Sequence, residues 1–417
     1  MRQDVRYRAR WIVPVSSPPL EGGEVAVRDG RIVSVEPWAP AGAGPDVVDL
    51  GDSVLFPGFV NAHTHLDWSH RAGVATRVEG DFTDWVYDLI SRPLPDRTVV
   101  ESAARRSARS MAESGVSLVG DFCLSAATGA SRLRAAGLGG VLFLELLHLQ
   151  ASRAAEMIRQ SESLGVWEAD ADSFSSPRLS VAPAPHGPHT VSRELLEALA
   201  PGLARGGLLA IHLAESAAER EFVLTGEGPF RRLHENRGNW DGSWTPPGVS
   251  PVAYLDGLGL LTEATLAVHC VHVDAEDIER LARSGCSVAI CPRSNEWTGA
   301  GRAPLPALLA AGIRCCLGTD SLASNADLDM ASELAFARRS WPEIPAEVLV
   351  TMATLGGAAG LGRTGAGGFG EIAPGRAASL AKATIPPGTP QGGDPHAILC
   401  GDFGPIRCHR AGREGSL

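Results

Sequence analysis

The chain has 417 residues, of which 44% are hydrophobic and 20% charged, and its formal net charge is −11. The apolar fraction supports a large buried core and excludes a disordered chain, while the negative charge argues against nucleic-acid binding, because phosphate backbones are repelled. No stretch reaches the roughly 20 uncharged apolar residues of a membrane span, and the N-terminus lacks the long apolar region of a signal peptide.

The two ends of the chain are rich in strand patterns. Asp29-Gly30 lies between two such runs and predicts a β-hairpin. We expect residues 1–56 and 366–417 to form one small β-sandwich domain. Its predicted strands lie at 11–15, 24–27, 31–35 and 47–50, and strand-like runs recur at 370–375 and 397–400.

The middle, residues 57–365, alternates apolar runs of strand length with helical segments. Near-continuous apolar strands separated by helices indicate a parallel sheet covered on both faces. Eight such units favour a closed (β/α)8 TIM barrel, an α/β fold, over an open doubly wound sheet. The strands are predicted to begin near 58, 116, 141, 179, 208, 265, 286 and 313, and helices at 100–114, 152–164, 192–205, 274–284 and 329–340, with Asp274 as an N-cap.

Polar residues gather at the predicted carboxyl ends of these strands, where barrel enzymes carry their functional side chains. Seven of the twelve histidines lie there, together with two acids. The set is His63, His65, His186, His189, His212, Glu215, His269, His272 and Asp320.

His63 and His65 stand two apart on one strand, so their side chains project from the same face. They could be a pair of satisfied polar residues, or two ligands of one metal ion. His212 and Asp320, at matching strand ends, favour the metal interpretation. We expect one zinc ion per chain held by these four residues, although iron(II) or manganese(II) would also suit nitrogen and oxygen ligands.

A metal site of this kind lowers the pKa of a water molecule and makes hydroxide available near neutral pH. Asp320 would then act as the base. Glu215, three residues after His212, is the expected acid, unless it is a solvated acid in a first helical turn. His269 is expected to hydrogen-bond the attacking oxygen.

These residues resemble the amidohydrolase superfamily, in its branch of mononuclear zinc deaminases. The motifs are PGFVNAHTH (57–65), HLAE (212–215), VHCVH (268–272) and GTDS (318–321), and the resemblance covers essentially the whole chain. It implies that His63, His65, His212 and Asp320 bind metal, that Glu215 shuttles a proton to a ring nitrogen, and that His269 polarises the reacting centre. Many binuclear relatives bridge two metals with a carbamylated lysine, whereas Lys382 is the only lysine in this chain.

Several segments further resemble the aminodeoxyfutalosine deaminases of menaquinone biosynthesis, namely PAPHGPHTVS (183–192), GEGPF (226–230), SPVAYL (250–255), CPRSN (291–295) and GTDSLASN (318–325). This implies deamination of a 6-aminopurine nucleoside, with 6-amino-6-deoxyfutalosine as the preferred substrate. His186 would then meet the ribose side of the nucleoside, while His189 stands where relatives often carry tyrosine. Adenosine, methylthioadenosine, S-adenosylhomocysteine or guanine remain alternative substrates, as does another heteroaromatic C–N or C–Cl bond.

Three further residues are candidates for substrate contact. Trp85, on the long loop after the first barrel strand, could stack on a flat base or pack on the surface. Arg293 could bind a substrate anion or pair with a nearby acid. Ser321 follows Asp320 in the same motif and is expected at the substrate.

A different class of function is a metal-free scaffold related to these enzymes, which would have gaps among its ligands. This chain has none. Its eight cysteines form no CxxC pair, so we expect buried free thiols in a reducing cytoplasm. The sequence leaves the oligomeric state open, a homodimer included.

Overall fold

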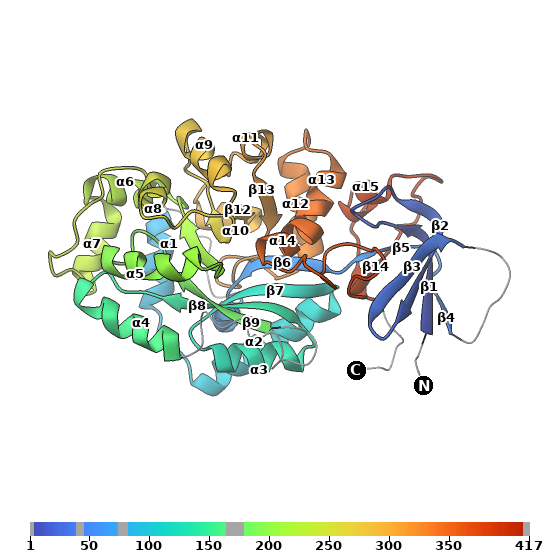
Figure 1. Cartoon of the computed structure of the whole chain (residues 1–417), viewed down its shortest axis with the longest axis horizontal. Helices are drawn as coiled ribbons and strands as arrows, with labels where there is room; N and C mark the ends of the chain where they lie inside the picture. The colour runs from blue at the N-terminus through green and yellow to red at the C-terminus, as the bar shows by residue number, and fades with distance from the viewer. Residues whose placement is uncertain (1–3, 39–45, 74–81, 164–178, 412–417) are drawn as a thin grey trace.

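The computed structural model describes residues 4–38, 46–73, 82–163 and 179–411. Its centre consists of eight parallel strands that alternate with helices along the chain (Figure 1). All eight predicted strands are confirmed, each starting within two residues of its predicted start. They are β6 (Phe59–Thr64), β7 (Val116–Cys123), β8 (Gly139–Leu146), β9 (Leu179–Pro185), β10 (Leu209–Leu213), β11 (Thr265–His269), β12 (Ser287–Ile290) and β13 (Arg314–Leu317).

These strands form two four-stranded parallel sheets, ordered β6-β7-β8-β9 and β10-β11-β12-β13. Single backbone hydrogen bonds join the two sheets near their carboxyl ends, from His212 N to His186 O and from Asp320 N to His63 O, both 3.0 Å long. The predicted alternation of parallel strands and helices is therefore confirmed, whereas the described residues contain no continuous ladder that closes all eight strands into a ring.

Neighbouring residues of one strand face two different hydrophobic cores. In β6, Phe59 packs in the cluster between the strands and the helices, whereas Val60 and Ala62 belong to a second cluster enclosed by the strands. Every residue of β6 and β7 is buried. Burial on both faces explains why these strands read as continuous apolar runs rather than as alternating ones.

The helices lie outside the strands (Figure 1). The predicted helices correspond to α2, α4, α5, α9 and α12, although residue 164 of the second lies outside the described residues. Asp274 caps α9 in a reciprocal capping box, as predicted. No helix in the described part of the chain is both long and apolar enough to span a bilayer. The helices are α1 (Phe82–Ser91), α2 (Arg97–Glu113), α3 (Ala126–Ala135), α4 (Ala154–Ser163), α5 (Arg193–Ala204), α6 (Ala217–Thr225), α7 (Pro229–Asn236), α8 (Pro251–Gly257), α9 (Ala275–Ser284), α10 (Pro292–Thr298), α11 (Leu305–Ala310), α12 (Met330–Ser340), α13 (Ala346–Thr351), α14 (Gly357–Gly360) and α15 (Pro395–Leu399).

Strands from both ends of the chain meet in one separate sheet, drawn in blue and red at the right of Figure 1. The prediction of a sandwich is wrong in one respect, because all seven strands belong to a single hydrogen-bonded sheet. The long strand β1 pairs with β4 through its first half and with β5 through its second half, so the sheet continues without a break. Its strands are β1 (Asp4–Ile12), β2 (Leu20–Arg28), β3 (Arg31–Pro37), β4 (Val47–Asp49), β5 (Ser53–Pro57), β14 (Leu380–Thr384) and β15 (Cys408–Arg410).

The C-terminal strands differ from the prediction. Residues 370–375 are irregular, and 397–400 lie at the end of helix α15 instead of in a strand. The physical reason is an N-cap: the Asp394 side chain accepts a hydrogen bond from His396 N, and Pro395 occupies the first helical turn. By contrast, Asp29 and Gly30 both have positive φ and form the predicted hairpin between β2 and β3.

Gly318 brings the end of β13 against the first barrel strand. A Cβ atom added at this position would lie 2.8 Å from both the Cβ and the carbonyl oxygen of His63. Only glycine therefore lets the two backbones approach closely enough for Asp320 N to bond His63 O. The same approach positions the side chains of both residues.

Gly318→Ala should lower the free energy of unfolding by about 1–3 kcal/mol, because backbone and side-chain atoms of His63 must move apart. Urea unfolding measures this change. Gly257→Ala is the matched control, since its Cβ would meet open space at the end of α8, and it should change stability by less than about 0.5 kcal/mol. Equal stability of the two variants would contradict the close approach.

The buried carboxyl of Glu219 fixes the turn after β10. Its oxygens accept hydrogen bonds from Ala214 N at 2.8 Å and Glu215 N at 2.7 Å. Ala214 has a φ of 50°, a left-handed conformation that is strained for alanine. Glu219 thus stabilises the turn from which the Glu215 side chain projects.

Burial raises the pKa of Glu219 from its ordinary 4.5 to about 7. Between these values the folded state holds a proton that the unfolded state has lost, so this group makes the free energy of unfolding fall as the pH rises through that window. Glu219→Gln cannot titrate. Its stability relative to the wild type should therefore improve between about pH 5 and about pH 8, measured by urea unfolding. Glu279→Gln, on the exposed face of α9, is the control and should have the same free energy of unfolding as the wild type at both pH values. If the difference in free energy of unfolding between Glu219→Gln and the wild type does not change with pH, the raised pKa of Glu219 is refuted.

Candidate functional site

Four strands deliver the five central side chains of the site from their carboxyl ends. His63 lies in β6 and His65 directly after it, His212 lies in β10, and His269 is the last residue of β11. Asp320 follows β13. All five residues are buried, with at most 7% of their surface exposed. The fold therefore brings together the residues that the strand-end pattern selected.

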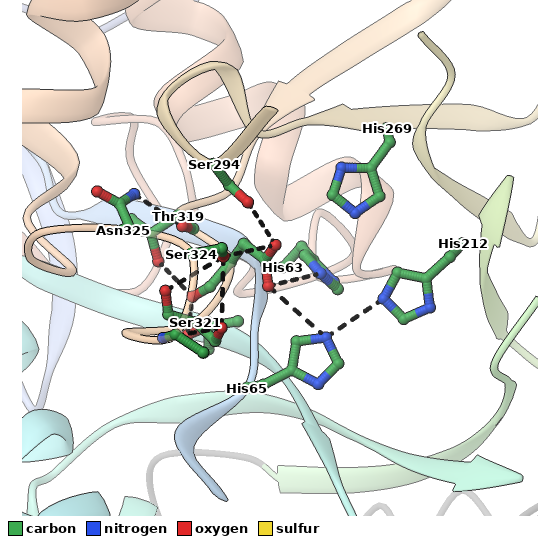
Figure 2. A network of polar contacts seen from close by, with 12 residues as sticks. His63, His65, His212, His269, Ser294, Thr319, Ser321, Ser324 and Asn325 are labelled. Carbon is green, nitrogen blue, oxygen red and sulfur yellow. Dashed lines mark hydrogen bonds and ion pairs between the residues drawn. The ribbon is translucent and has the colours of Figure 1, made fainter. Parts of the chain in front are cut away.

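The rings of His63, His65 and His212 turn toward one another (Figure 2). His65 Nε2 lies 3.2 Å from His212 Nε2. Asp320 Oδ1 lies 3.7 Å from His63 Nε2 and 3.8 Å from His65 Nε2. One nitrogen from each of the three histidines lies within 4.8 Å of the other two. The three imidazoles of His63, His65 and His212 and the carboxylate of Asp320 therefore converge on one point, and we call this group of four side chains the cage.

This donor set fits a divalent cation. His63 Nε2, the ring nitrogen that faces Asp320, is buried with no hydrogen-bond partner among the described residues, an arrangement that is costly unless another group satisfies it. Burial lowers the pKa of His63, His65 and His212, so that the rings are neutral, the form that binds a metal. His212 Nδ1 bonds the carbonyl oxygen of His186 at 2.7 Å, which leaves Nε2 directed into the cage.

Asp320 is held as a carboxylate. Burial alone would raise its pKa, but the surrounding imidazoles of His63, His65 and His269 hold the pKa of Asp320 well below its usual range. Its second oxygen, Oδ2, accepts hydrogen bonds from Ser294 Oγ at 2.6 Å and Ser324 Oγ at 3.0 Å. Oδ1 is left to face the imidazoles.

The backbone at the site is strained. Asp320 has a φ of 58° and His269 a φ of 75°, both in the left-handed region that non-glycine residues rarely adopt. Such strain persists where the surrounding structure over-determines a conformation, and it is concentrated at functional sites.

Glu215 is a buried, neutral acid beside His269. Burial raises the pKa of Glu215 well above its usual range, and the nearby charges of Asp320 and Glu219 raise it further. Its Oε1 lies 3.4 Å from His269 Nε2. Because Glu215 is only 7% exposed, the alternative of a solvated acid in a first helical turn is wrong.

Asn295 orients His269 from the other side. Its Oδ1 lies 2.9 Å from His269 Nδ1 and accepts that proton, which leaves Nε2 as the acceptor that faces Glu215. The site therefore contains a proton donor and an anionic acceptor on the two sides of one cage.

The cage forms the inner end of a cavity of about 830 Å³. His186, Trp85 and Ser321 line this cavity. Burial lowers the pKa of His186 to about 3, and its Nδ1 lies 2.8 Å from Thr190 Oγ1. Trp85 Nε1 donates to Ala323 O at 3.3 Å, so its ring is fixed against the loop that follows Asp320.

Arg293 lies elsewhere. Its guanidinium forms two hydrogen bonds to Asp327, of 2.7 and 3.0 Å, and Glu333 Oε2 lies 3.9 Å from it. It is absent from the cavity wall. Of the two alternatives for Arg293, its contacts match pairing with an acid.

Four residues of the site were not among the predicted ones. Glu145 ends the apolar run of β8 and places Oε1 3.8 Å from His65 Nδ1, so the strand-end rule that found the histidines would have found it. Ser294 and Asn295 follow β12 and were open to the same reasoning. Ser324 reaches Asp320 only through the fold of the loop after β13, which no sequence pattern reveals.

Comparisons with known proteins agree with this geometry. The amidohydrolase family model matches residues 54–385. The aminodeoxyfutalosine deaminase of Deinococcus radiodurans is 35% identical over 348 residues, 79% of this chain and 80% of that protein. A 5-methylthioadenosine/S-adenosylhomocysteine deaminase of Moorella thermoacetica is 33% identical over 365 residues, 84% of this chain and 79% of its own.

A solved structure has the same architecture. The adenosine deaminase of Xanthomonas campestris with bound zinc superposes with a TM-score of 0.75 at 26% identity, covering 95% of this chain and 88% of that one. Family model, relatives and architecture together extend over both the central strands and the terminal sheet. The chain belongs to the amidohydrolase family and is an aminohydrolase that acts on C–N bonds.

Proposed function

We propose that the protein is a zinc-dependent deaminase of a 6-aminopurine nucleoside. The observation that carries the proposal is a pair of carboxyl groups held in opposite protonation states around one cage. Glu215 is neutral and can donate a proton, whereas Asp320 is anionic and can accept one. Hydrolytic deamination of an amidine carbon needs both functions at once.

One zinc ion held by His63, His65, His212 and Asp320 would lower the pKa of a water molecule and supply a nucleophile near neutral pH. Asp320 takes the proton from that water as its oxygen bonds to C6 of the purine, and His269 Nε2 accepts a hydrogen bond from the same water. Glu215 protonates N1. Asp320 then returns the proton to the amine and the C6–N bond breaks as ammonia leaves. The remaining hydroxyl proton passes back to Glu215, which restores the acid and leaves an inosine-like product with a carbonyl at C6.

The relatives support a substrate built on adenosine. The two reported deaminases are named for nucleosides that share the 6-aminopurine and ribose and differ at the 5′ end. We propose 6-amino-6-deoxyfutalosine as the substrate of this chain, in menaquinone biosynthesis, because the more similar of these two relatives is named for it. Methylthioadenosine and S-adenosylhomocysteine are the nearest alternatives.

We further propose that the two four-stranded sheets act as a closed (β/α)8 barrel, residues 57–365, with residues 1–56 and 366–417 as a supporting β-domain. The outermost segments 1–3 and 412–417 lie outside the described residues. All eight cysteines are free and buried, which suits a reducing cytoplasm.

Wild-type protein supplied with zinc should contain about one metal equivalent per chain, and His63→Ala far less, because one of three imidazole donors is lost. Elemental analysis measures the content. Chelation should lower the Tm of the wild type but hardly that of His63→Ala. His409→Ala, an exposed histidine on β15, should retain the metal. Two equivalents per chain would refute a mononuclear site.

Glu215→Gln should lower kcat for ammonia release by about a hundredfold to ten-thousandfold while the metal content stays unchanged, because an amide cannot deliver the proton to N1. Glu221→Gln, exposed on the neighbouring helix α6, is the control and should keep wild-type turnover. Retained activity in Glu215→Gln would remove this residue from the acid role.

A further inference from the structure

The cavity changes character from its inner to its outer end. Its inner donors, such as His65 and Asp320, are each 7% exposed. Toward solvent the wall includes Leu94, Leu124 and Leu147, which are 71%, 70% and 39% exposed. Large apolar side chains that are this exposed and gathered at one cavity mark a binding surface more often than chance.

Two of these leucines occupy the positions where other strands carry polar groups. Leu124 directly follows β7, and Leu147 directly follows β8. Histidines or Asp320 stand at or just after the ends of β6, β9, β10, β11 and β13. The ends of β7 and β8 therefore place exposed leucines on the cavity wall, beside Glu145 and His148.

Two acids beside these leucines, Asp67 and Glu101, are already paired with arginine. Arg132 Nη2 donates to Asp67 Oδ1 at 2.6 Å and lies 3.7 Å from Glu101 Oε2. Arg105 Nε pairs with Glu101 Oε1 at 2.9 Å. An ammonium group entering this part of the cavity would therefore find Asp67 and Glu101 already paired, and its desolvation would be poorly compensated.

We infer that this outer compartment holds the 5′ substituent of the nucleoside and selects a large apolar group over a hydroxyl or a zwitterionic amino acid. The inference rests on the proposed function: with the purine amine at the cage and the ribose beside His186, the 5′ carbon points to the mouth. A volume of about 830 Å³ lies toward the upper end of the range for ligand pockets and has room beyond the ribose. Leu124 and Leu147 are the residues that determine specificity.

The first test compares four substrates of the zinc-loaded enzyme by ammonia release: adenosine, methylthioadenosine, 5′-phenylthio-5′-deoxyadenosine and S-adenosylhomocysteine. We expect kcat/KM to be about 30-fold higher for the phenylthio compound than for adenosine, since a phenyl ring becomes buried. Methylthioadenosine should lie between them, and S-adenosylhomocysteine should be the poorest substrate.

The second test uses the Leu124→Ser/Leu147→Ser double variant. The ratio of kcat/KM for the phenylthio compound to that for adenosine should fall about tenfold. The Kd of the product, 5′-phenylthio-5′-deoxyinosine, should rise by a similar factor in calorimetry, a readout that needs no turnover. Leu224→Ser, a 45%-exposed leucine on α6 that is absent from the cavity wall, is the control and should leave both values unchanged.

The possible outcomes distinguish a failure of the proposed function from a failure of the inference about the outer compartment. Absence of ammonia release from all four nucleosides and from 6-amino-6-deoxyfutalosine would overturn the proposed function. Deamination with adenosine or S-adenosylhomocysteine preferred over the phenylthio compound, or an unchanged ratio in the double variant, would overturn the inference about the outer compartment and leave the deaminase proposal standing.

Discussion

Four buried donor groups, three imidazoles and one carboxylate, face one another at the inner end of the cavity with no other protein group between them. His63 illustrates the constraint, because Nε2, the ring nitrogen that faces Asp320, is buried and unsatisfied among the described residues. Buried polar groups without partners destabilise a fold by an amount comparable to a lost hydrogen bond or more. A divalent cation would satisfy His63 Nε2, so the group proposed for catalysis would also stabilise the fold.

Residues around the cage hold its four side chains in position. Gly318 lets β13 approach β6, Glu219 holds the strained turn beyond His212, and Ser294 and Ser324 occupy one oxygen of Asp320 so that the other faces inward. None of these residues needs to touch a substrate. Each restricts the orientation of a group that would touch the substrate. Such restriction pre-organises the site, because its groups are already oriented for the reaction before the substrate binds.

The two carboxyl groups near the cage show how position sets protonation. Glu215 has buried surroundings and acidic neighbours, so its pKa rises, whereas Asp320 faces three histidines and its pKa falls. Beyond them the cavity passes from polar groups to exposed leucines. The inner part is suited to a reaction that this family shares, and the outer part to the choice among substrates that differ at one end.

The sequence by itself determined the eight strands, the hairpin at Asp29-Gly30, the cap at Asp274 and the convergence of His63, His65, His212 and Asp320, because strand-end position is encoded in local patterns. Only the tertiary structure decided other points. Arg293 pairs with Asp327 across the loop after β13, residues 397–400 form a capped helix, and the terminal strands join into one sheet. These outcomes depend on contacts between residues far apart in the chain, or on competition between local structures of similar energy, which hydrophobic periodicity does not reveal.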